Sequence, residues 1–373
     1  MMEIRAAVLE ELNAPLALKR LTLDEPGPGE VLVKVAATGV CASDAHTRSG
    51  RIPSPLPTVL GHEGAGVVVD TGPGVTHVVP GDHVALSWVP NCGRCRYCQA
   101  GRPVLCAAVG PALLAGTLLD GTVRMHDGGR DVYHYSFLST FADHTVVPGV
   151  SAIKIADTVP LAVAALAGCA VLTGYGAVVN RAKVSAGDSV LVYGAGGVGL
   201  SAVMAARLVG AGQIVVVDPE RVKREGAIVF GATHAFGPTD DVVDSVRGLT
   251  GGAGADVTID AVGAEGLLEQ AFDATAPGGT VVCVGVPSAT AYASVPGARF
   301  VREEKYLTGS LYGSSRPSQD IPRLLSLFTA GKLPIDKLIS QTYAFEEIDR
   351  AFDDTARGQV RRAVVIVDED LAQ

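Results

Sequence analysis

The chain has 373 residues, more than one typical hydrophobic core holds, which indicates about two domains. Its 30 Lys and Arg against 39 Asp and Glu give a net charge of −9, and no basic run exceeds a pair, so nucleic acid and anionic membrane surfaces are poor partners. Residues 1–11 carry four charged side chains and no apolar run of the length that a signal peptide needs, so we expect no secretory signal and a cytoplasmic location.

Short strands are predicted in the first part of the chain. Apolar and polar residues alternate over 6–38, and the sequence PGPG at 26–29 marks a tight turn, which together indicate small antiparallel strands. The same pattern returns over 67–84. Between these stretches lie the sequences CASDAH at 41–46 and GHE at 61–63, which contain candidate metal ligands.

A group of four cysteines follows, separated by two, two and seven residues: Cys92, Cys95, Cys98 and Cys106. Short gaps let four sulfurs share one tetrahedral ion without closing a long loop, so we predict a structural zinc lobe over 91–107. Four thiolates leave the ion no open position, so it performs no chemistry. The alternatives are two disulfides or cysteines packed in a core, but an odd total of seven cysteines favours the metal.

The middle of the chain gives weaker signals. Residues 107–140 are rich in glycine and lack periodicity, so we expect irregular structure that shapes an entrance to a site. Residues 141–155 are typical of strand. Residues 161–179 carry no charge and nearly reach the length of a membrane span, but three glycines interrupt them. We expect a buried helix and turn there rather than a membrane anchor.

A nucleotide-binding motif opens the next part of the chain. An apolar strand at 190–193 leads into the sequence GAGGVG at 194–199, a helical pattern follows, and a second strand at 214–217 ends on Asp218. This order of strand, glycine loop, helix and acidic residue is a strong Rossmann signal. The loop should supply a tight turn, close backbone approach to a pyrophosphate and close helix packing, through Gly194, Gly196, Gly197, Val198 and Gly199.

The residue after the second strand predicts the cofactor. Asp218 is expected to accept hydrogen bonds from the adenosine ribose and to repel a 2′-phosphate, which favours NAD over NADP. Arg221 and Lys223 are close enough in sequence to offer a cation, which opposes that preference. The alternative interpretation of the loop is a glycine-rich turn in an unrelated α/β domain.

Further strands alternate with helices in this part of the chain. The pattern predicts helices over 241–249 and 267–275 and makes about six strands in all, which suits a parallel, doubly wound sheet. The additional strands are expected at 233–236, 256–260, 280–284 and 306–309.

A second zinc site is predicted from Cys41, His62 and Cys169. Two thiolates and a neutral imidazole balance the dication and leave a fourth position open for a substrate oxygen. Asp44 and Glu63, each next to a ligand in sequence, are expected to orient the imidazole or tune the metal. Taken singly, each ligand has the alternative of a core cysteine or a hydrogen-bonded histidine, and each acid that of a solvated surface residue.

A metal of this kind can acidify a bound alcohol, and the proton of that alcohol must then leave the site. Ser43 lies two residues after Cys41, so its hydroxyl can take that proton and pass it to His46, a base that titrates near neutral pH. The alternatives are a turn hydroxyl for Ser43 and a solvent-exposed side chain for His46.

Together these motifs resemble the zinc-dependent medium-chain alcohol dehydrogenases. The similarity covers nearly the whole chain, through residues 39–44, 61–64, the four cysteines, 168–169 with 173–176, and 194–199. The resemblance implies an α/β protein in which a GroES-like, mostly β catalytic domain encloses a doubly wound Rossmann domain. The implied ranges are 1–170 and 311–373 for the catalytic domain and 171–310 for the Rossmann domain.

The resemblance also implies roles for individual residues. Cys41, His62 and Cys169 would hold a catalytic zinc, with Glu63 beside it, and Ser43 and His46 would relay the proton through the cofactor ribose. Lys223 would assist Asp218, and Arg362 would meet the pyrophosphate. The expected cofactors are NAD and two zinc ions per chain, and the expected assembly is a homodimer.

The implied activity is that of an NAD-linked alcohol dehydrogenase (EC 1.1.1.-) that interconverts alcohols and aldehydes. The positions that line the alcohol pocket in relatives are mostly apolar or aromatic here, which favours aromatic or medium-chain primary alcohols: Ile52, Trp88, Tyr135, Val286 and Leu311. One alternative is a polyol or secondary-alcohol dehydrogenase, against which Cys169 argues because such enzymes often carry a carboxylate there. The other is a non-catalytic zinc and NAD redox sensor, which Ser43 and His46 disfavour.

Overall fold

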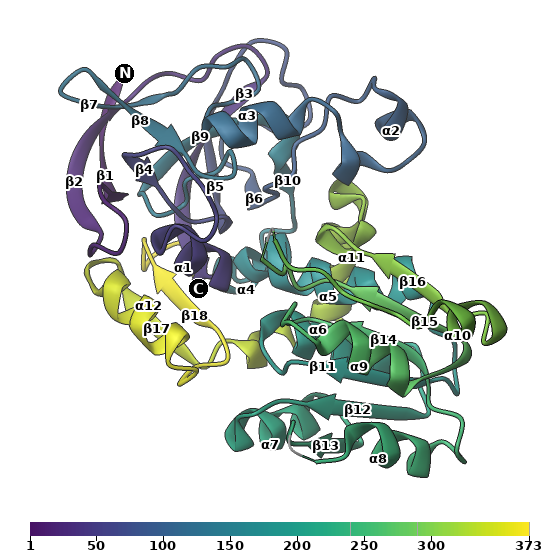
Figure 1. Cartoon of the computed structure of the whole chain (residues 1–373). Helices are drawn as coiled ribbons and strands as arrows, with labels where there is room; N and C mark the ends of the chain where they lie inside the picture. Colours follow the sequence, from purple (N-terminus) through teal and green to yellow (C-terminus); the bar gives the residue numbers. More distant parts are fainter. Residues whose placement is uncertain (239, 289, 373) are drawn as a thin grey trace. The chain divides into compact units, whose positions relative to one another are not determined.

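The computed structural model describes residues 1–238, 240–288 and 290–372, and the chain divides into two compact units (Figure 1). Unit 1 comprises Met1–Cys169, Arg316–Ala330 and Ile335–Gln373, and unit 2 comprises Ala170–Ser315 and Gly331–Pro334. Unit 1 is therefore built from both ends of the chain. The sequence placed the boundaries after residues 170 and 310. Positions 239, 289 and 373, which fall inside the expected domains, lie outside the described residues.

Unit 1 is mostly β. Five strands form a closed barrel in the order β1-β2-β7-β8-β4, and the others form a sheet in the order β10-β6-β5-β3-β18-β17, with β9 also paired to β3. The barrel strands are β1 (Met2–Leu9), β2 (Ala17–Leu23), β4 (Thr58–Val59), β7 (Met125–Asp127) and β8 (Arg130–His134). The sheet strands are β3 (Glu30–Val40), β5 (Glu63–Thr71), β6 (His83–Leu86), β9 (His144–Pro148), β10 (Ala152–Lys154), β17 (Gln341–Ala344) and β18 (Ala363–Ile366).

Strand β3 is the centre of that sheet. It pairs antiparallel with β5, β9 and the C-terminal β18, and all but one of its eleven residues are buried. A strand covered on both faces needs a continuous apolar run rather than alternation, and the sequence EVLVKVAATGV supplies it. Residues from the two ends of the chain therefore share one core, in which Val35 and Val40 lie in the same cluster as Val365.

Short helices connect the strands of unit 1. The α-helices are α1 (Ala42–Arg48), α2 (Arg96–Gln99), α3 (Val109–Ala115), α4 (Leu161–Leu166), α11 (Pro317–Thr329) and α12 (Ile348–Ala356). The 3₁₀ turns are η1 (Pro103–Leu105), η2 (Gly149–Ser151), η6 (Ile335–Leu338) and η7 (Phe345–Glu347).

The expectation of irregular structure over 107–140 was wrong for part of that stretch. Helix α3 lies there, and strands β7 and β8 pair as a hairpin that helps to close the barrel. The strands are only three and five residues long, too short to show periodicity. The glycine-rich turn between them, Gly128 and Gly129, takes positive φ angles of 58° and 87°, which a tight turn favours.

Unit 2 contains a six-stranded sheet in the order β13-β12-β11-β14-β15-β16, and every neighbouring pair is parallel. Numbered along the chain from β11, this is the order 3-2-1-4-5-6 of the Rossmann sheet. The strands are β11 (Ser189–Tyr193), β12 (Gln213–Val217), β13 (His234–Phe236), β14 (Ala255–Asp260), β15 (Thr275–Cys283) and β16 (Tyr306–Gly309).

Helices cover both faces of this sheet. Leu191 and Val215 share a core cluster with residues of α8 and α9, whereas Val192, which points to the opposite face, lies beside Gly199 of α6. The helices of unit 2 are α5 (Leu172–Gly176), α6 (Gly197–Leu208), α7 (Arg221–Phe230), α8 (Val242–Leu249), α9 (Leu267–Ala274) and α10 (Gly297–Arg302), with a 3₁₀ turn η5 (Tyr312–Ser314).

One continuous helical stretch, Leu161–Ala182, is long and apolar enough to cross a membrane by length and composition, with a mean hydropathy of 1.9. Of the apolar window, 83% is buried inside the protein, which agrees with the buried helix predicted here. The stretch is irregular, because α4 and α5 are joined by a π-helical segment, η3 (Ala167–Val171), and a second one, η4 (Ala177–Ala182), follows. Such segments are frequent at functional sites.

Candidate active site

Four potential metal ligands of unit 1 converge in a buried cluster. One donor atom each from Cys41, His62, Glu63 and Cys169 lies within 4.8 Å of all the others. Cys41 follows the end of β3, and His62 and Glu63 stand at the start of β5. These two strands pair in register near their ends, with Gly39 opposite Glu63. The sheet therefore brings together residues that are about twenty positions apart in sequence.

Cys169 reaches the cluster from a helix that lies very close to the sheet. It belongs to the π-helical segment η3, and a Cβ atom on the preceding Gly168 would lie 2.2 Å from the carbonyl oxygen of Leu86 in β6. No side chain fits in that space. Gly168 therefore lets the helix approach the sheet closely enough for the Cys169 sulfur to face the other donors.

We expect Gly168→Ala to weaken metal binding at this cluster. The added methyl group collides with backbone, so the helix must shift and carry Cys169 with it, and zinc should be lost to a chelator at least about tenfold faster. Metal analysis and chelator kinetics measure this. Gly110→Ala is the matched control, because a Cβ there meets nothing within 4 Å. Wild-type zinc retention in Gly168→Ala would show that this close approach does not position the ligand.

Asp44 organises the donors from helix α1. One carboxylate oxygen accepts hydrogen bonds from the Gly61 backbone N–H and from His62 Nδ1, both at 3.1 Å, and the other accepts from the Cys41 backbone N–H at 3.0 Å. The side chain is fully buried. Because Nδ1 of His62 is used in this way, Nε2 is the nitrogen left for a metal.

Glu63 is held by an arginine from the other end of the chain. Nη2 of Arg362 donates to Oε1 of Glu63, and Nη1 donates to the Val40 carbonyl at 3.4 Å. Oε2 of Glu63 is buried and has no hydrogen-bond partner among the described residues. A buried, unpartnered carboxylate oxygen is costly unless a ligand satisfies it. The sequence suggested Arg362 for a pyrophosphate and did not predict this ion pair.

The electrostatics of the cluster favour a cation. A hydrogen bond from Cys169 lowers the pKa of Cys41 well below its usual value, and the same contact raises the pKa of Cys169. Burial lowers the pKa of His62, but the Asp44 carboxylate more than offsets this and leaves it well above its usual value. Burial raises the pKa of Glu63 to about 7. Two sulfurs, an imidazole and an orphaned carboxylate oxygen form a donor set that fits zinc.

The two proposed relay residues lie on helix α1 beside the cluster. Ser43 and His46 are half-buried, and no hydrogen bond joins them within the described part of the chain. Nη1 of Arg51 lies 3.4 Å from Nε2 of His46, and burial together with this positive charge lowers the pKa of His46.

The candidate pocket residues fall into two groups. Trp88 and Tyr135 flank the His62 ring, with T-shaped contacts at centroid distances of 6.3 and 5.6 Å, and Ile52 is half-buried in the same unit. Val286 and Leu311 belong to unit 2, where their exposed fractions are 75% and 47%. The structure therefore brings two of the five candidates into contact with a candidate metal ligand.

The second cluster is the cysteine lobe. One sulfur each from Cys92, Cys95, Cys98 and Cys106 lies within 4.8 Å of the others, and all seven cysteines of the chain are free. Backbone N–H groups, chiefly that of Cys98, lower the pKa of Cys95 to about 6, whereas burial raises the pKa of Cys98 to about 12. Four converging sulfurs without a disulfide fit a structural zinc ion, as the spacing predicts.

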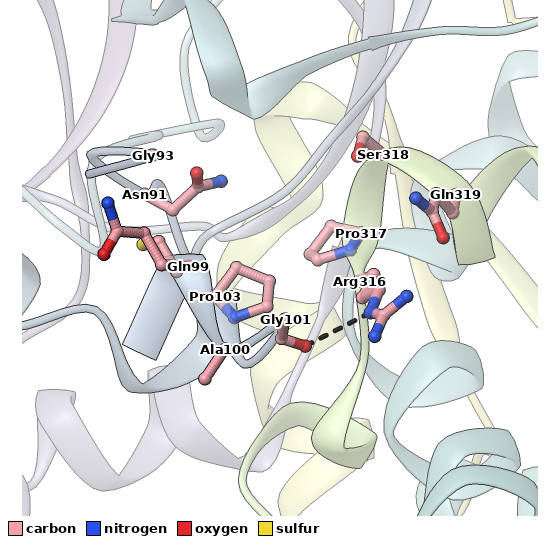
Figure 2. A pocket seen from close by; sticks show the side chains of 11 residues that line it. Asn91, Gly93, Gln99, Ala100, Gly101, Pro103, Arg316, Pro317, Ser318 and Gln319 are labelled. Atoms are coloured by element: carbon pink, nitrogen blue, oxygen red, sulfur yellow. Dashed lines mark hydrogen bonds between the residues drawn. The ribbon is translucent and has the colours of Figure 1, made fainter. Parts of the chain in front are cut away.

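A cavity of about 490 Å³ lies between this lobe and the start of α11 (Figure 2). Figure 2 shows Arg316 directed at the lobe, where its Nε donates to the Gly101 carbonyl at 3.1 Å. None of the donors of the first cluster lines this cavity. The lobe therefore contacts a helix of the same unit while staying separate from the candidate active site.

The glycine loop of unit 2 has the geometry that its sequence predicts. Gly194 has a φ of 91°, which favours glycine, and a Cβ on Gly199 would lie 1.8 Å from the Gly194 carbonyl oxygen. Gly196 precedes the first turn of α6, which begins at Gly197 and includes Val198. A Cβ on Gly196 would meet nothing within 4 Å. Open space beside a helix N-terminus suits a pyrophosphate.

Asp218 follows β12, but its carboxylate also binds the loop. One oxygen accepts from the Ala195 N–H and the other from the Glu220 N–H, both at 2.8 Å. Arg221 pairs with Glu225, and Lys223 is half-buried. Arg224, which the sequence did not single out, donates from Nη1 to the Asp218 carbonyl at 2.7 Å. Arg224 lies six residues after Asp218, and Asp218 precedes helix α7, so no helical spacing signalled this contact.

Two family descriptions match separate parts of the chain: an alcohol dehydrogenase GroES-like domain over residues 27–157 and a zinc-binding dehydrogenase over 197–330. NDMA-dependent alcohol dehydrogenase from Amycolatopsis methanolica is 41% identical across 99% of this chain and 100% of its own. The chain belongs to the zinc-dependent medium-chain alcohol dehydrogenases. This confirms the resemblance and the α/β fold with a GroES-like and a Rossmann part, and it makes the protein an oxidoreductase of the alcohol dehydrogenase type.

Solved structures of this alcohol dehydrogenase family have the same fold. An alcohol dehydrogenase zinc-binding domain protein from Burkholderia ambifaria is 35% identical, with a TM-score of 0.95 over 99% of this chain and 100% of that one. Benzyl alcohol dehydrogenase from Acinetobacter calcoaceticus is 34% identical, with a TM-score of 0.94 over 98% and 100%.

Proposed function

We propose that this alcohol dehydrogenase is zinc-dependent and NAD-linked, and that it interconverts primary aromatic or medium-chain alcohols and their aldehydes by hydride transfer. The observation that carries the proposal is the buried convergence of Cys41, His62 and Cys169 beside the unpartnered Glu63 oxygen. The same chain carries a Rossmann glycine loop. A reactive metal and a dinucleotide are the two parts that alcohol oxidation requires.

The residues of the first cluster would hold the catalytic zinc, and the cysteine lobe a structural one. When bound, the catalytic ion supplies Lewis acidity to a substrate hydroxyl. Cys41 and Cys169 contribute two negative charges and His62 none, which balances the dication without quenching it. Asp44 fixes the imidazole orientation, and Glu63 with Arg362 forms a neutral buried pair behind it.

The glycine loop would hold the dinucleotide, with Asp218 and Lys223 at the ribose, whereas Arg362, which the resemblance assigns to the pyrophosphate, is buried against Glu63. NAD supplies the hydride acceptor when bound. Asp218 favours NAD over NADP because its carboxylate would repel a 2′-phosphate. Its hydrogen bonds from the Ala195 N–H of the loop and from the Glu220 N–H keep that charge in place.

Ser43 and His46 would move the proton that the alcohol releases. Neutral His46 is the base, so kcat/KM should fall as the pH drops through the pKa of His46, which Arg51 and burial hold below its usual value. We expect Arg51→Gln to raise that pKa and to move the acid limb of the profile to higher pH by about half a unit. Arg20→Gln, a change at an exposed arginine of the barrel, should leave the limb in place. An unmoved limb in Arg51→Gln would exclude His46 as the titrating base.

The test of the activity is the absorbance of NADH formed with a panel of alcohols. Benzylic and medium-chain primary alcohols should reduce NAD, polyols and secondary alcohols should react poorly, and NADP should replace NAD weakly. No NADH formation with any alcohol in zinc-replete protein would count against a freely exchanging cofactor.

A relative named for NDMA dependence supplies the second form of this test. The same panel should be run with NDMA as an added electron acceptor and without added NAD. Turnover under those conditions alone would support alcohol oxidation and would indicate a cofactor that stays bound to the enzyme. No turnover under either condition would favour the redox-sensor alternative.

The proposed assembly is a homodimer. Strand β16 ends the unit 2 sheet, and Tyr306 on it is 64% exposed. An edge strand offers unpaired backbone groups to a second chain. Sedimentation should give twice the chain mass. The proposed compartment is the cytoplasm, which suits seven cysteines without a disulfide.

A further inference from the structure

Tyr135 contacts the candidate metal site at two points. It follows strand β8 and is 7% exposed. The edge of its ring packs against the His62 imidazole at 5.6 Å between centroids and 72° between planes. Trp88 packs against the same imidazole at 85°. Two aromatic rings therefore limit how far the His62 ring can rotate.

The phenol of Tyr135 forms a second contact, with helix α1. Its oxygen lies 3.0 Å from Oγ1 of Thr47, and that Oγ1 also lies 3.0 Å from the Ser43 carbonyl. A hydroxyl has one proton to donate. Thr47 Oγ1 is the donor toward both the Tyr135 phenol oxygen and the Ser43 carbonyl, so these two acceptors share its one proton.

Both contacts of Tyr135 affect the orientation of the His62 imidazole. Helix α1 carries Asp44, which binds His62 Nδ1, and Thr47 lies one turn further along the same helix. The Tyr135 ring holds His62 directly, and the phenol holds the helix whose carboxylate orients it. Thr47 is 1% exposed, so water does not replace this hydrogen bond.

The backbone after Tyr135 is strained, and this strained turn fixes the direction of the chain there. Ser136, Phe137 and Ser139 have φ angles of 51°, 64° and 49°, in the left-handed region that non-glycine residues rarely adopt. The Tyr135 N–H donates to Ser139 Oγ at 3.0 Å, which closes this turn. Backbone strain of this kind is concentrated at functional sites, where the surrounding structure enforces it.

We infer that Tyr135 is a positioning residue of the metal site. Its ring orients His62 directly, and its phenol orients His62 indirectly, through Thr47 and helix α1. This rests on the proposed zinc site. Its phenol faces Thr47, so its role extends beyond the pocket lining that the resemblance implies. Removing the phenol should leave the ring contact in place but loosen α1, and with it the imidazole.

The test is the release of zinc to a chromogenic chelator, without substrate or NAD, from Tyr135→Phe, Thr47→Val and the double variant. Each zinc site should release its ion in a separate kinetic phase, and the phase that is missing in His62→Ala reports on this site. Each single variant should release that zinc about tenfold faster, with an unchanged lobe phase. The double variant should match Thr47→Val, because both changes break one hydrogen bond. Tyr133→Phe, on strand β8 itself, is the matched control.

Steady-state kinetics separates this inference from the proposed function. In a chain that oxidises alcohols, Tyr135→Phe should lower kcat more than it changes KM, and a chain that oxidises none still reports through zinc release. Unchanged release in Tyr135→Phe, or a loss of thermal stability without faster release, would overturn the inference. If Tyr135→Phe fails to fold, Thr47→Val decides it, with Thr47→Ser as the variant that should restore the wild-type rate.

Discussion

His62→Ala should reduce alcohol oxidation by at least about 10³-fold while the protein stays folded. A Lewis acid contributes several kcal/mol to stabilising the transition state, and about 1.4 kcal/mol corresponds to a factor of ten. The fold should survive because Asp44, the buried partner of His62, keeps its bonds to the Cys41 and Gly61 N–H groups. Metal analysis should find one zinc per chain in place of two.

The control for this variant is His77→Ala. His77 is exposed on a loop, where Nε2 lies 2.9 Å from the Gly149 carbonyl, and it belongs to neither cluster. It should keep both zinc ions and the full rate. Full activity in His62→Ala, or two zinc ions with unchanged turnover, would contradict the assignment of the first cluster as the catalytic centre.

Cys106→Ser should remove the other zinc and destabilise the protein. Cys106 is 6% exposed and shares a core cluster with barrel residues such as Met125 and Val132, so the loss of the metal should disturb more than the loop. We expect a loss of at least about 3 kcal/mol in unfolding free energy. For a chain of 373 residues that corresponds to about 4 °C or more in thermal midpoint.

Cys283→Ser is the matched control, because this half-buried cysteine of unit 2 lies in neither cluster. It should retain two zinc ions and the wild-type midpoint. In Cys106→Ser, the zinc that remains should be the one that His62→Ala loses. A Cys106→Ser protein with wild-type stability and two zinc ions would contradict a structural ion in the lobe.

The two ions are expected to differ because of what surrounds the sulfurs. In the lobe, four thiols and several backbone N–H groups would enclose an ion and leave no position for a substrate. In the first cluster, two thiols and one imidazole would hold an ion and leave a further position for the carboxylate of Glu63 or for a substrate. Arg362 forms an ion pair with that carboxylate, so its positive charge offsets the negative charge of Glu63 beside the open position.

The sequence predicted the local elements well where a pattern extends over a whole element. Strand β16 begins and ends at the predicted residues, 306 and 309, and the helix over 242–249 differs from its prediction by one residue. The hairpin at 125–134 was missed because short strands provide too few residues for a period. Helix α1 was not predicted either, although Asp44 three residues after Cys41 is the spacing of a carboxylate that caps a helix start.

The candidate site shows a similar division. The four lobe cysteines could be assigned from spacing alone, because short gaps leave few arrangements. The other three ligands could not, since Cys41 and Cys169 are 128 positions apart and nothing local pairs them. The contacts of Thr47 with Tyr135 and of Arg362 with Glu63 were missed because each depends on a distant partner that the fold supplies.

By itself, the sequence determined the features in which neighbouring residues act together: the cysteine lobe, the glycine loop with its helix, and the buried character of the helix over 161–179. Only the tertiary structure decided which distant side chains meet. Gly168 has room for no side chain beside β6, so Cys169 faces His62, and the pairing of β3 with β18 places Arg362 on Glu63. The physical reason is that periodicity and spacing constrain a chain over a few turns, whereas a metal site depends on the packing of whole elements against one another.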